Sequence, residues 1–472
     1  MSDTGTLEAL LREAGAGVIY TDALDVLPYQ RDVSVAPPGS AAAVVRPQNT
    51  AGVARVLEMA SRKGIPVYAR GGGTMYAGGM NPHEGGIVID LSSLDEIVRV
   101  DRERGLVVAQ PGVRFGALLK RLAKDGLTVG IVPVTGPSAT IGGAASAHAL
   151  GTGSPKFQSF ADEVAGLEAV LADGTVVRTG SAAAPNAGYF HRNCIGPDLT
   201  GLFLGGDATL GVITELALWT HPLPEHRETL CLGFENTEAA ARCVAAVQND
   251  DMTGHLWYAA GYEAATIAGR MSAVYPDRDP AGFPKFCVAL ELGGREAAVV
   301  ADRDAIVARA IEQGGAVFPE FDEVYFRKLR FDESFWYSFA GYFSRSRCGI
   351  LMSSLPTMRI PAFIETVGEY RSKHPDYLWA GAVVFCRRGA HGGVIAFYDE
   401  ATQWDGMRET LRGCTADLVD IGCVPYKTGK IWADQIVRFD AYHGLLRRIK
   451  SELDPTGILS PGNLGLDRRN VR

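Results

Sequence analysis

Residues 70–79 read RGGGTMYAGG, and they follow directly on a short apolar run at residues 65–69. Five of the nine residues from Gly71 to Gly79 are glycine. Because glycine has no Cβ atom, a loop of this composition can turn several backbone N–H groups toward one point. We interpret the loop as an anion nest that holds a pyrophosphate without a lysine. The alternative is an ordinary flexible surface loop.

Two later segments favour the nest. Residues 136–147 (GPSATIGGAASA) are small almost throughout, which suits backbone that lies flat against a rigid planar ligand, although packing between helices is the alternative. Residues 205–215 (GGDATLGVITE) form a glycine turn that enters a β-branched strand. Because three such segments occur in the first half of the chain, we predict that one extended ligand contacts all of them. Three unrelated loops are the less favoured explanation.

Common nucleotide-binding and hydrolase signatures are missing from the sequence. No GxGxxG follows a predicted strand and no GxxxxGK[ST] occurs, so a Rossmann or P-loop site has no support. The KTG triplet at 427–429 matches one β-lactamase motif, but its SxxK partner is absent. The predicted pyrophosphate site is therefore of another kind.

Composition excludes several classes of protein. Glycine accounts for 56 of 472 residues, about 12% against a usual value of about 7%. The formal charge is −8 without basic clusters, which argues against a nucleic-acid partner. No apolar stretch approaches the roughly 18 residues that cross a bilayer, and the first residues lack the basic start of a signal peptide. Eight scattered cysteines without a CxxC indicate reduced thiols, no metal site and a cytoplasmic location.

The chain is long enough for at least two hydrophobic cores. Residues 1–222 are rich in glycine loops, whereas helical stretches alternate with strand-like runs over residues 223–423. Residues 424–472 again contain glycine-rich turns, as residues 1–222 do. We predict a first domain over 1–222, a second domain with a helix-covered sheet over 223–423, and a C-terminal return to the first domain over 424–472.

Five motifs occur in a diagnostic order: RGGGTxxxGG, GPSATIGGAAS, LEAVLADGTVVRTG, GGDATLGVITE and DPTGILSPGNL. This order resembles the vanillyl-alcohol-oxidase/p-cresol-methylhydroxylase superfamily of FAD enzymes. The resemblance implies an α+β fold with a two-lobed FAD-binding domain and a cap domain whose antiparallel sheet is covered by helices. It also implies these FAD-binding residues: Arg70, Gly71, Gly72, Gly73, Thr74, Met75, Gly78, Pro137, Ser138, Ala139, Gly142, Gly143, Ser146, Ala147, Gly211, Val212, Ile213 and Asn463.

The resemblance bears on how the flavin is held. Many relatives carry a histidine in the pyrophosphate loop that bonds the flavin covalently, but this loop reads Thr74-Met75-Tyr76. Another branch uses a cap-domain residue, and the matching position here is Gly349 or Cys348. We therefore predict non-covalent FAD.

The phenol-oxidising branch of the superfamily carries a late Tyr-Arg pair and a tyrosine in the pyrophosphate loop. Tyr426, Lys427 and Tyr76 stand in those places, so we expect two hydroxyls and a cation that stabilise a phenolate. That branch also places an acidic residue near the flavin, in the segment that resembles residues 144–151 here, and this segment contains no acid. His148 is its titratable side chain and is our candidate acid or base. The alternative for these four residues is that their side chains pack in the fold without a catalytic role.

Nine aromatic residues crowd positions 325–343, and they suit either a hydrophobic core or the wall of a pocket for an aromatic substrate.

We predict an FAD-dependent oxidoreductase that transfers hydride from an alcohol or para-substituted phenol to flavin N5, with reoxidation by O₂ or another acceptor. The expected partners are a small aromatic substrate and a second copy of the chain in a homodimer. One alternative is a D-2-hydroxyacid or sugar-type dehydrogenase. That branch carries a metal-binding HxGDGNxH motif, whereas the nearest stretch here contains one histidine, His391, and no Asp-Gly-Asn. Another alternative is a non-catalytic flavin-binding electron-transfer or scaffold protein.

Overall fold

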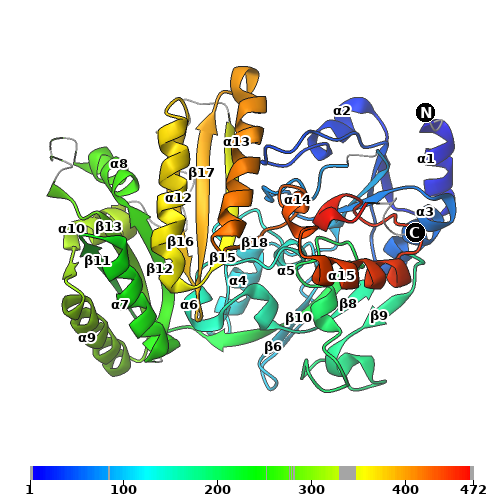
Figure 1. The fold of residues 1–472 in the computed structure, drawn as a ribbon. Helices are drawn as coiled ribbons and strands as arrows, with labels where there is room; N and C mark the ends of the chain where they lie inside the picture. The colour runs from blue at the N-terminus through cyan, green and yellow to red at the C-terminus, as the bar shows by residue number, and fades with distance from the viewer. Residues whose placement is uncertain are drawn as a thin grey trace.

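A computed structural model describes most of the chain, and the elements below refer to that part. The described residues are 4–82, 85–250, 252–275, 277, 279, 282–328 and 347–467. Within these ranges no helix combines the length and apolar character that a membrane span requires. The chain folds into a two-lobed domain and a cap domain that stand side by side (Figure 1).

The first lobe is a four-stranded sheet in the order β1-β2-β4-β3. Strands β2 (Ala43–Arg46), β4 (Ile87–Asp90) and β3 (Val67–Arg70) are parallel, and β1 (Val18–Tyr20) is antiparallel to β2. Helix α3 (Thr50–Lys63) connects β2 to β3. The Asn49 side chain caps its start, and Gly64, with a φ of 64°, ends it in the left-handed conformation. Helices α1 (Thr4–Glu13) and α2 (Ala23–Val26) complete the lobe.

The second lobe is an antiparallel sheet in the order β5-β6-β10-β8-β9, with β7 paired to the far end of β10. Its core is apolar and includes the faces of helices α4 and α5. The bounds are β5 (Arg99–Asp101), β6 (Leu106–Ala109), α4 (Phe115–Ala123), β7 (Leu127–Val129), α5 (Ile141–Ser146), α6 (Ser154–Phe157), β8 (Val164–Val170), β9 (Val176–Arg178) and β10 (Val212–Pro222).

The cap domain contains an eight-stranded antiparallel sheet in the order β14-β11-β13-β12-β16-β17-β15-β18. The sheet thus includes β18, which begins at residue 424 and pairs with β15. Its strands are β11 (His226–Phe234), β12 (Leu256–Glu263), β13 (Phe286–Gly294), β14 (Ala316–Val317), β15 (Arg347–Leu355), β16 (Leu378–Phe385), β17 (Ala390–Tyr398) and β18 (Val424–Tyr426). Its helices are α7 (Thr237–Asn249), α8 (Ala264–Val274), α9 (Glu296–Glu312), α10 (Pro319–Asp322), α12 (Ile360–Lys373) and α13 (Glu400–Asp420).

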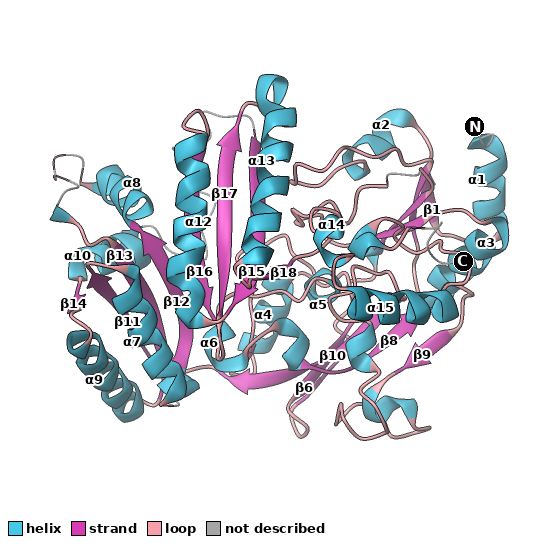
Figure 2. Ribbon diagram, viewed as in Figure 1, coloured by secondary structure: helices cyan, strands magenta, loops and turns pink. Residues whose placement is uncertain are grey.

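The two faces of the cap sheet have different neighbours, because successive side chains of a strand point to opposite sides. Helices α7, α9, α12 and α13 pack on one face and form the largest core of the chain (Figure 2). On the other face, at the β15-β16-β17 end, a small apolar cluster includes Cys348, Ile350 and Ile395. Tyr76 of the two-lobed domain packs against this cluster. The cap sheet therefore turns an apolar surface toward the glycine loop.

The chain returns to the two-lobed domain after β18. Helices α14 (Ala433–Ile436) and α15 (Asp440–Leu453) lie on the same side of the molecule as α1 and α3 (Figure 1). The backbone N–H of Val67 in β3 donates to Ile458 at 2.8 Å, and the N–H of Ser460 donates back to Val67 at 2.8 Å. The C-terminal segment is thus tied directly to the strand that precedes the glycine loop. The α+β class with a helix-covered antiparallel cap sheet is confirmed.

Candidate functional site

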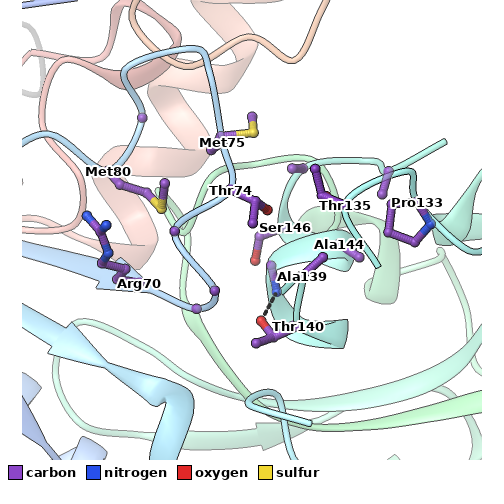
Figure 3. A pocket seen from close by; sticks show the side chains of 18 of the residues that line it. Arg70, Thr74, Met75, Met80, Pro133, Thr135, Ala139, Thr140, Ala144 and Ser146 are labelled. Atoms are coloured by element: carbon purple, nitrogen blue, oxygen red, sulfur yellow. Dashed lines mark hydrogen bonds between the residues drawn. The ribbon is translucent and has the colours of Figure 1, made fainter. Parts of the chain in front are cut away.

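A cavity opens where the glycine loop after β3 faces helix α5, and Figure 3 shows the two walls from close by. Its empty volume is about 1090 Å³, including the open mouth. Residues 69–76 form one wall and residues on and around α5 form the opposite one. Asp207, Ala208 and Ile213 contribute a third side, and Lys427 reaches in from the segment after β18. Segments far apart in sequence thus enclose one elongated space.

The glycine loop is pressed against the segment before α5, which explains its composition. A Cβ atom on Gly72 would stand 2.0 Å from the Ser138 carbonyl oxygen, and one on Gly71 would stand 2.3 Å from the Thr140 Oγ1. Gly73 has a φ of 70°, which a residue with a side chain rarely adopts. The loop therefore has no room for side chains on this side, and its backbone forms the wall.

Buried polar groups hold the far end of the loop from behind. The Asp32 carboxylate accepts the Gly78 N–H at 2.7 Å, and burial raises the pKa of Asp32. The Lys430 ammonium donates to the Gly78 carbonyl at 3.1 Å, and the Asn463 amide donates to the Gly79 carbonyl at 2.9 Å. Gly78 and Asn463 thus shape the loop without lining the cavity.

The opposite wall begins at Thr140, whose side chain caps α5 by accepting the Gly143 N–H at 3.3 Å. The helix is short and built of small residues, so its backbone comes close to the cavity. The sequence-predicted residues that line this wall are Ala139, Gly142, Gly143, Ser146 and Ala147. Pro137 and Ser138 lie outside the lining.

The third side contains one of the three residues predicted from the GGDATLGVITE motif. Ile213 lines the cavity, whereas Gly211 and Val212 do not. A Cβ atom on Gly211 would stand 2.7 Å from the Phe203 ring, and Val212 pairs with Val170 in the sheet. These two residues serve the packing of β10 behind the cavity.

Side chains from the loop, the cap sheet and the segment after it come together at one end of the cavity. Tyr76 and Lys427 line it, and Tyr426 lies directly behind with 7% of its surface exposed. The Lys427 Nζ donates to the Ala147 carbonyl at 2.8 Å and stands 5.2 Å from the Tyr426 ring centroid. The Tyr426 hydroxyl donates to the His148 carbonyl at 2.5 Å. Tyr76, Tyr426 and Lys427 are therefore brought together.

The two histidines near this group occupy different positions. The His391 ring lies 4.4 Å from the Tyr426 ring, centroid to centroid, and its Nδ1 is 3.0 Å from the Ser354 Oγ. Burial, together with the charges of Lys427 and His148, lowers the pKa of His391 to about 3, so this ring is neutral. The His148 ring lies against Gly205, outside the lining, and desolvation by its surroundings lowers its pKa. His148 contacts the group through its backbone.

Burial changes the ionisation of the groups in this cluster. It lowers the pKa of Lys427 to about 7, against an opposing attraction by the Asp207 carboxylate. It raises the pKa of Tyr76, and it raises the pKa of Tyr426 further with the help of the nearby Tyr76. Both tyrosines are therefore protonated hydrogen-bond donors at neutral pH, whereas the ammonium of Lys427 is close to its titration point.

Comparison with known proteins finds FAD-related families in two parts of the chain. The "FAD binding domain" family matches residues 41–180, and the "FAD linked oxidases, C-terminal domain" family matches residues 440–464. The crystal structure of p-cresol methylhydroxylase superposes with a TM-score of 0.85 at 16% identity, over 99% of this chain and 98% of that one. The two family matches identify an FAD-binding domain and a C-terminal segment of FAD-linked oxidases, and the superposition shows a fold like that of p-cresol methylhydroxylase.

Two relatives differ in how much of their length they share with this chain. An uncharacterized FAD-linked oxidoreductase of Mycobacterium tuberculosis is 27% identical over 457 residues, 90% of this chain and 91% of the relative. The glycolate oxidase subunit GlcD of Bacillus subtilis is 36% identical over 204 residues, 43% of this chain. That second match spans 42% of the subunit's length, so less than half of the subunit is shared.

The cavity of this FAD-linked protein fits FAD. One wall is glycine backbone so close to Ser138 that a Cβ atom would clash, and the opposite wall is built of small residues. Both features suit a long ligand with a pyrophosphate and a flat ring system. Cys348 does not line the cavity, and burial raises the pKa of its thiol to about 11.

Several residues of the site were not singled out from the sequence. Asp207 was quoted only as part of its motif, yet it lines the cavity and its carboxylate accepts the Gly429 N–H. Pro133, Thr135 and Met80 line it too, and no local pattern marks them. Of the crowded aromatic segment 325–343, residues from 329 onward lie outside the described part of the chain. Phe326 is described and packs edge-on to Tyr258 in the cap.

Proposed function

We propose that this FAD-linked oxidoreductase removes hydride from an alcohol or a para-substituted phenol that binds beside Tyr76, Tyr426 and Lys427. One observation supports this above all: Tyr76 and Lys427 line the cavity, and Tyr426 is buried beside Lys427, whose Nζ stands 5.2 Å from the Tyr426 ring centroid. FAD, when bound, would supply the hydride acceptor and pass the electrons to O₂ or another acceptor. The chain's own residues bind the substrate, orient it and stabilise its charge.

For the cofactor we propose that residues 70–75 hold the pyrophosphate through backbone N–H groups. Ala139, Gly142, Gly143, Ser146 and Ala147, with Ile213 on the third side, would lie against the ring system. The remaining predicted residues, namely Gly78, Pro137, Ser138, Gly211, Val212 and Asn463, would support these walls from behind. Direct anion contacts through a glycine loop need no lysine, because backbone N–H groups form the nest.

The tyrosines and Lys427 would act on the oxygen of the substrate. Donors aimed at a developing phenolate or alkoxide stabilise it most where water is excluded. The apolar cap face, with Ile350, Met352 and Ile395, supports the exclusion of water, since it packs against Tyr76. The Tyr426 hydroxyl now donates to the His148 carbonyl, and it would turn from this carbonyl to the substrate oxygen.

A D-2-hydroxyacid dehydrogenase is the second candidate. The Bacillus subtilis relative is named as a glycolate oxidase subunit, and Lys427 offers a cation for a substrate carboxylate. A flavin-holding protein without small-molecule chemistry is the third candidate. A homodimer and a cytoplasmic location remain predictions.

An anaerobic substrate panel separates these candidates. Bleaching of the flavin absorption by alkylphenols or aromatic alcohols supports the first candidate, and bleaching by D-2-hydroxy acids alone supports the second. No bleaching by any member favours the third.

The role of Tyr426 has its own test. With the substrate found in that panel, Tyr426→Phe should slow flavin reduction about 10²- to 10³-fold, as the loss of one preorganised donor does. Tyr258→Phe is a matched control, because its hydroxyl is buried within hydrogen-bond distance of Tyr262 in the cap and does not line the cavity. Unchanged turnover in Tyr426→Phe would remove this residue from the mechanism.

A further inference from the structure

Asp207 joins three segments at the edge of the cavity. Its backbone N–H donates to the Ser146 carbonyl at 3.0 Å, at the end of α5. Its carboxylate Oδ2 accepts the Gly429 N–H at 2.9 Å, and its backbone carbonyl accepts the Asn463 amide at 3.4 Å. Asp207 also has a φ of 47°, a left-handed conformation that persists only where the surrounding contacts demand it.

Lys427 is held against the same wall from the other side. It too is left-handed, with a φ of 55°, and its Nζ donates to the Ala147 carbonyl. The hydrogen bonds of Asp207 and Lys427 thus end on consecutive carbonyls, those of Ser146 and Ala147. Gly429 lies two residues after Lys427, and its N–H donates to the Asp207 carboxylate. The position of the lysine therefore depends on this acid.

Charged and titratable groups of both signs surround Lys427 and Asp207. Lys427 faces Tyr426, the two histidines His148 and His391, and Asp207. Asp207 faces Lys427 and Lys430, and it is repelled by Asp32. Among the described residues, Asp207 is therefore the one acid whose charge acts on Lys427.

Burial disfavours the charged forms of Asp207 and Lys427, whereas the attraction between the two charges favours them. Desolvation raises the pKa of Asp207 to about 6 and lowers the pKa of Lys427 to about 7. The Asp207 carboxylate opposes this loss of charge on the lysine. Without that carboxylate the desolvation of the Lys427 ammonium would be uncompensated.

We propose that Asp207 is a positioning residue for Lys427: its carboxylate holds the 427–429 turn and keeps the lysine charged at the end of the cavity. Asp207 acts through Lys427 and needs no contact with the substrate. This inference deepens the proposed function and relies on it for the use of the ammonium. The ionisation of Lys427 itself can be measured without any substrate.

The test is an NMR titration of the holoenzyme with ¹³Cε-labelled lysine, in which Lys427→Arg assigns the signal by its loss. Asp207→Asn keeps an acceptor for the Gly429 N–H but removes the charge. We expect the midpoint of Lys427 to fall by at least about one pH unit, a tenfold rise in free amine at a given pH. Asp207→Glu should restore most of the midpoint. Glu215→Gln, which removes a half-buried acid of β10 outside the cavity lining, should leave it unchanged.

A midpoint that is the same in Asp207→Asn and in wild-type protein would overturn the proposal. Wild-type protein offers an independent check, should the variant fail to fold. Its Lys427 signal must show a second step at the pH where Asp207 takes up a proton, and a single step would equally overturn the proposal. If no substrate reduces the flavin, the proposed function fails, and the titration still decides this inference.

Discussion

The ammonium of Lys427 is the residue-scale feature with the clearest consequence for pH. Its pKa is lowered to about 7, so the charged form is present below that pH and is lost as the pH rises through it. If the ammonium stabilises a phenolate, kcat/KM should fall as the pH rises through about 7, by up to the 10²–10³ that one such donor supplies. The pH dependence of anaerobic flavin reduction measures this.

Lys427→Arg is the control for that prediction, since a guanidinium keeps its charge at every working pH. The decline near neutral pH should disappear in this variant, whatever its absolute rate. A decline of the same size in both proteins would place the titrating group elsewhere.

Gly72 is a second residue whose role can be measured. Gly72→Ala would bring a Cβ atom to 2.0 Å from the Ser138 carbonyl, and neither backbone can yield without moving a wall of the cavity. Strain of this kind is worth about 1–3 kcal/mol, so we expect the Kd for FAD to rise about 5- to 150-fold. Fluorescence titration of the apoprotein with FAD measures the change.

Gly116→Ala is the matched control for Gly72→Ala. Gly116 is exposed on α4 and has open space around it, so alanine should leave FAD binding unchanged and stabilise the helix by up to about 1 kcal/mol. Equal affinities for FAD in all three proteins would show that the glycine loop does not form the binding wall.

At the scale of elements, α15 is attached to the two-lobed domain by a buried ion pair. The Lys450 ammonium is 2.6 Å from the Asp454 carboxylate, with side-chain exposures of 1% and 0%, and it also donates to the carbonyls of Thr209 and Leu459. Removal of one partner leaves a buried charge alone. Lys450→Ala should lower the free energy of unfolding by about 3–5 kcal/mol, measured by denaturant titration of the holoprotein.

The pair Lys373–Glu369 on α12 has the same i,i+4 spacing at 3.1 Å, but its side chains are 60% and 62% exposed. Lys373→Ala should cost no more than about 0.5 kcal/mol. Similar losses in both variants would mean that burial of the Lys450 pair adds nothing to the attachment of α15.

Element-scale patterns were predictable where one segment carried its own signal. Helix α3 has an Asn cap, an apolar stripe and a final glycine, and all three are local features that the sequence itself displays. The small strand β18 gave no such signal, because three residues carry no period. Its membership in the cap sheet depends on pairing with β15, about seventy residues earlier in the chain.

At the scale of the whole molecule, non-covalent binding of FAD stays a prediction. The places where relatives attach the flavin are taken by Thr74 to Tyr76 in the loop and by Cys348 or Gly349 in β15. The Cys348 thiol is buried outside the cavity lining, and a Cβ atom on Gly349 would meet Leu411 on the helix-covered face. Acid precipitation should therefore release all of the yellow colour into the supernatant, and a yellow pellet would contradict this prediction.

The residues alone indicated a ligand with a pyrophosphate and a planar ring system, whereas FAD and the overall fold were inferred from the resemblance of the five motifs to a known superfamily. A nest, a flat wall and a glycine turn are properties of local backbone, and backbone freedom is visible wherever glycine and alanine gather. That is why the motifs at 70–79 and 136–147 pointed to the two walls that the structure contains.

Only the tertiary structure decided which side chains meet. Asp207 and Lys427 are 220 positions apart, and their coupling arises because β18 and the turn after it bring residues 427–429 to Asp207. His148 lies in the predicted segment, yet its left-handed backbone aims the ring at Gly205. Side-chain direction and long-range contact are set by packing and sheet register, and no local pattern of residues encodes them.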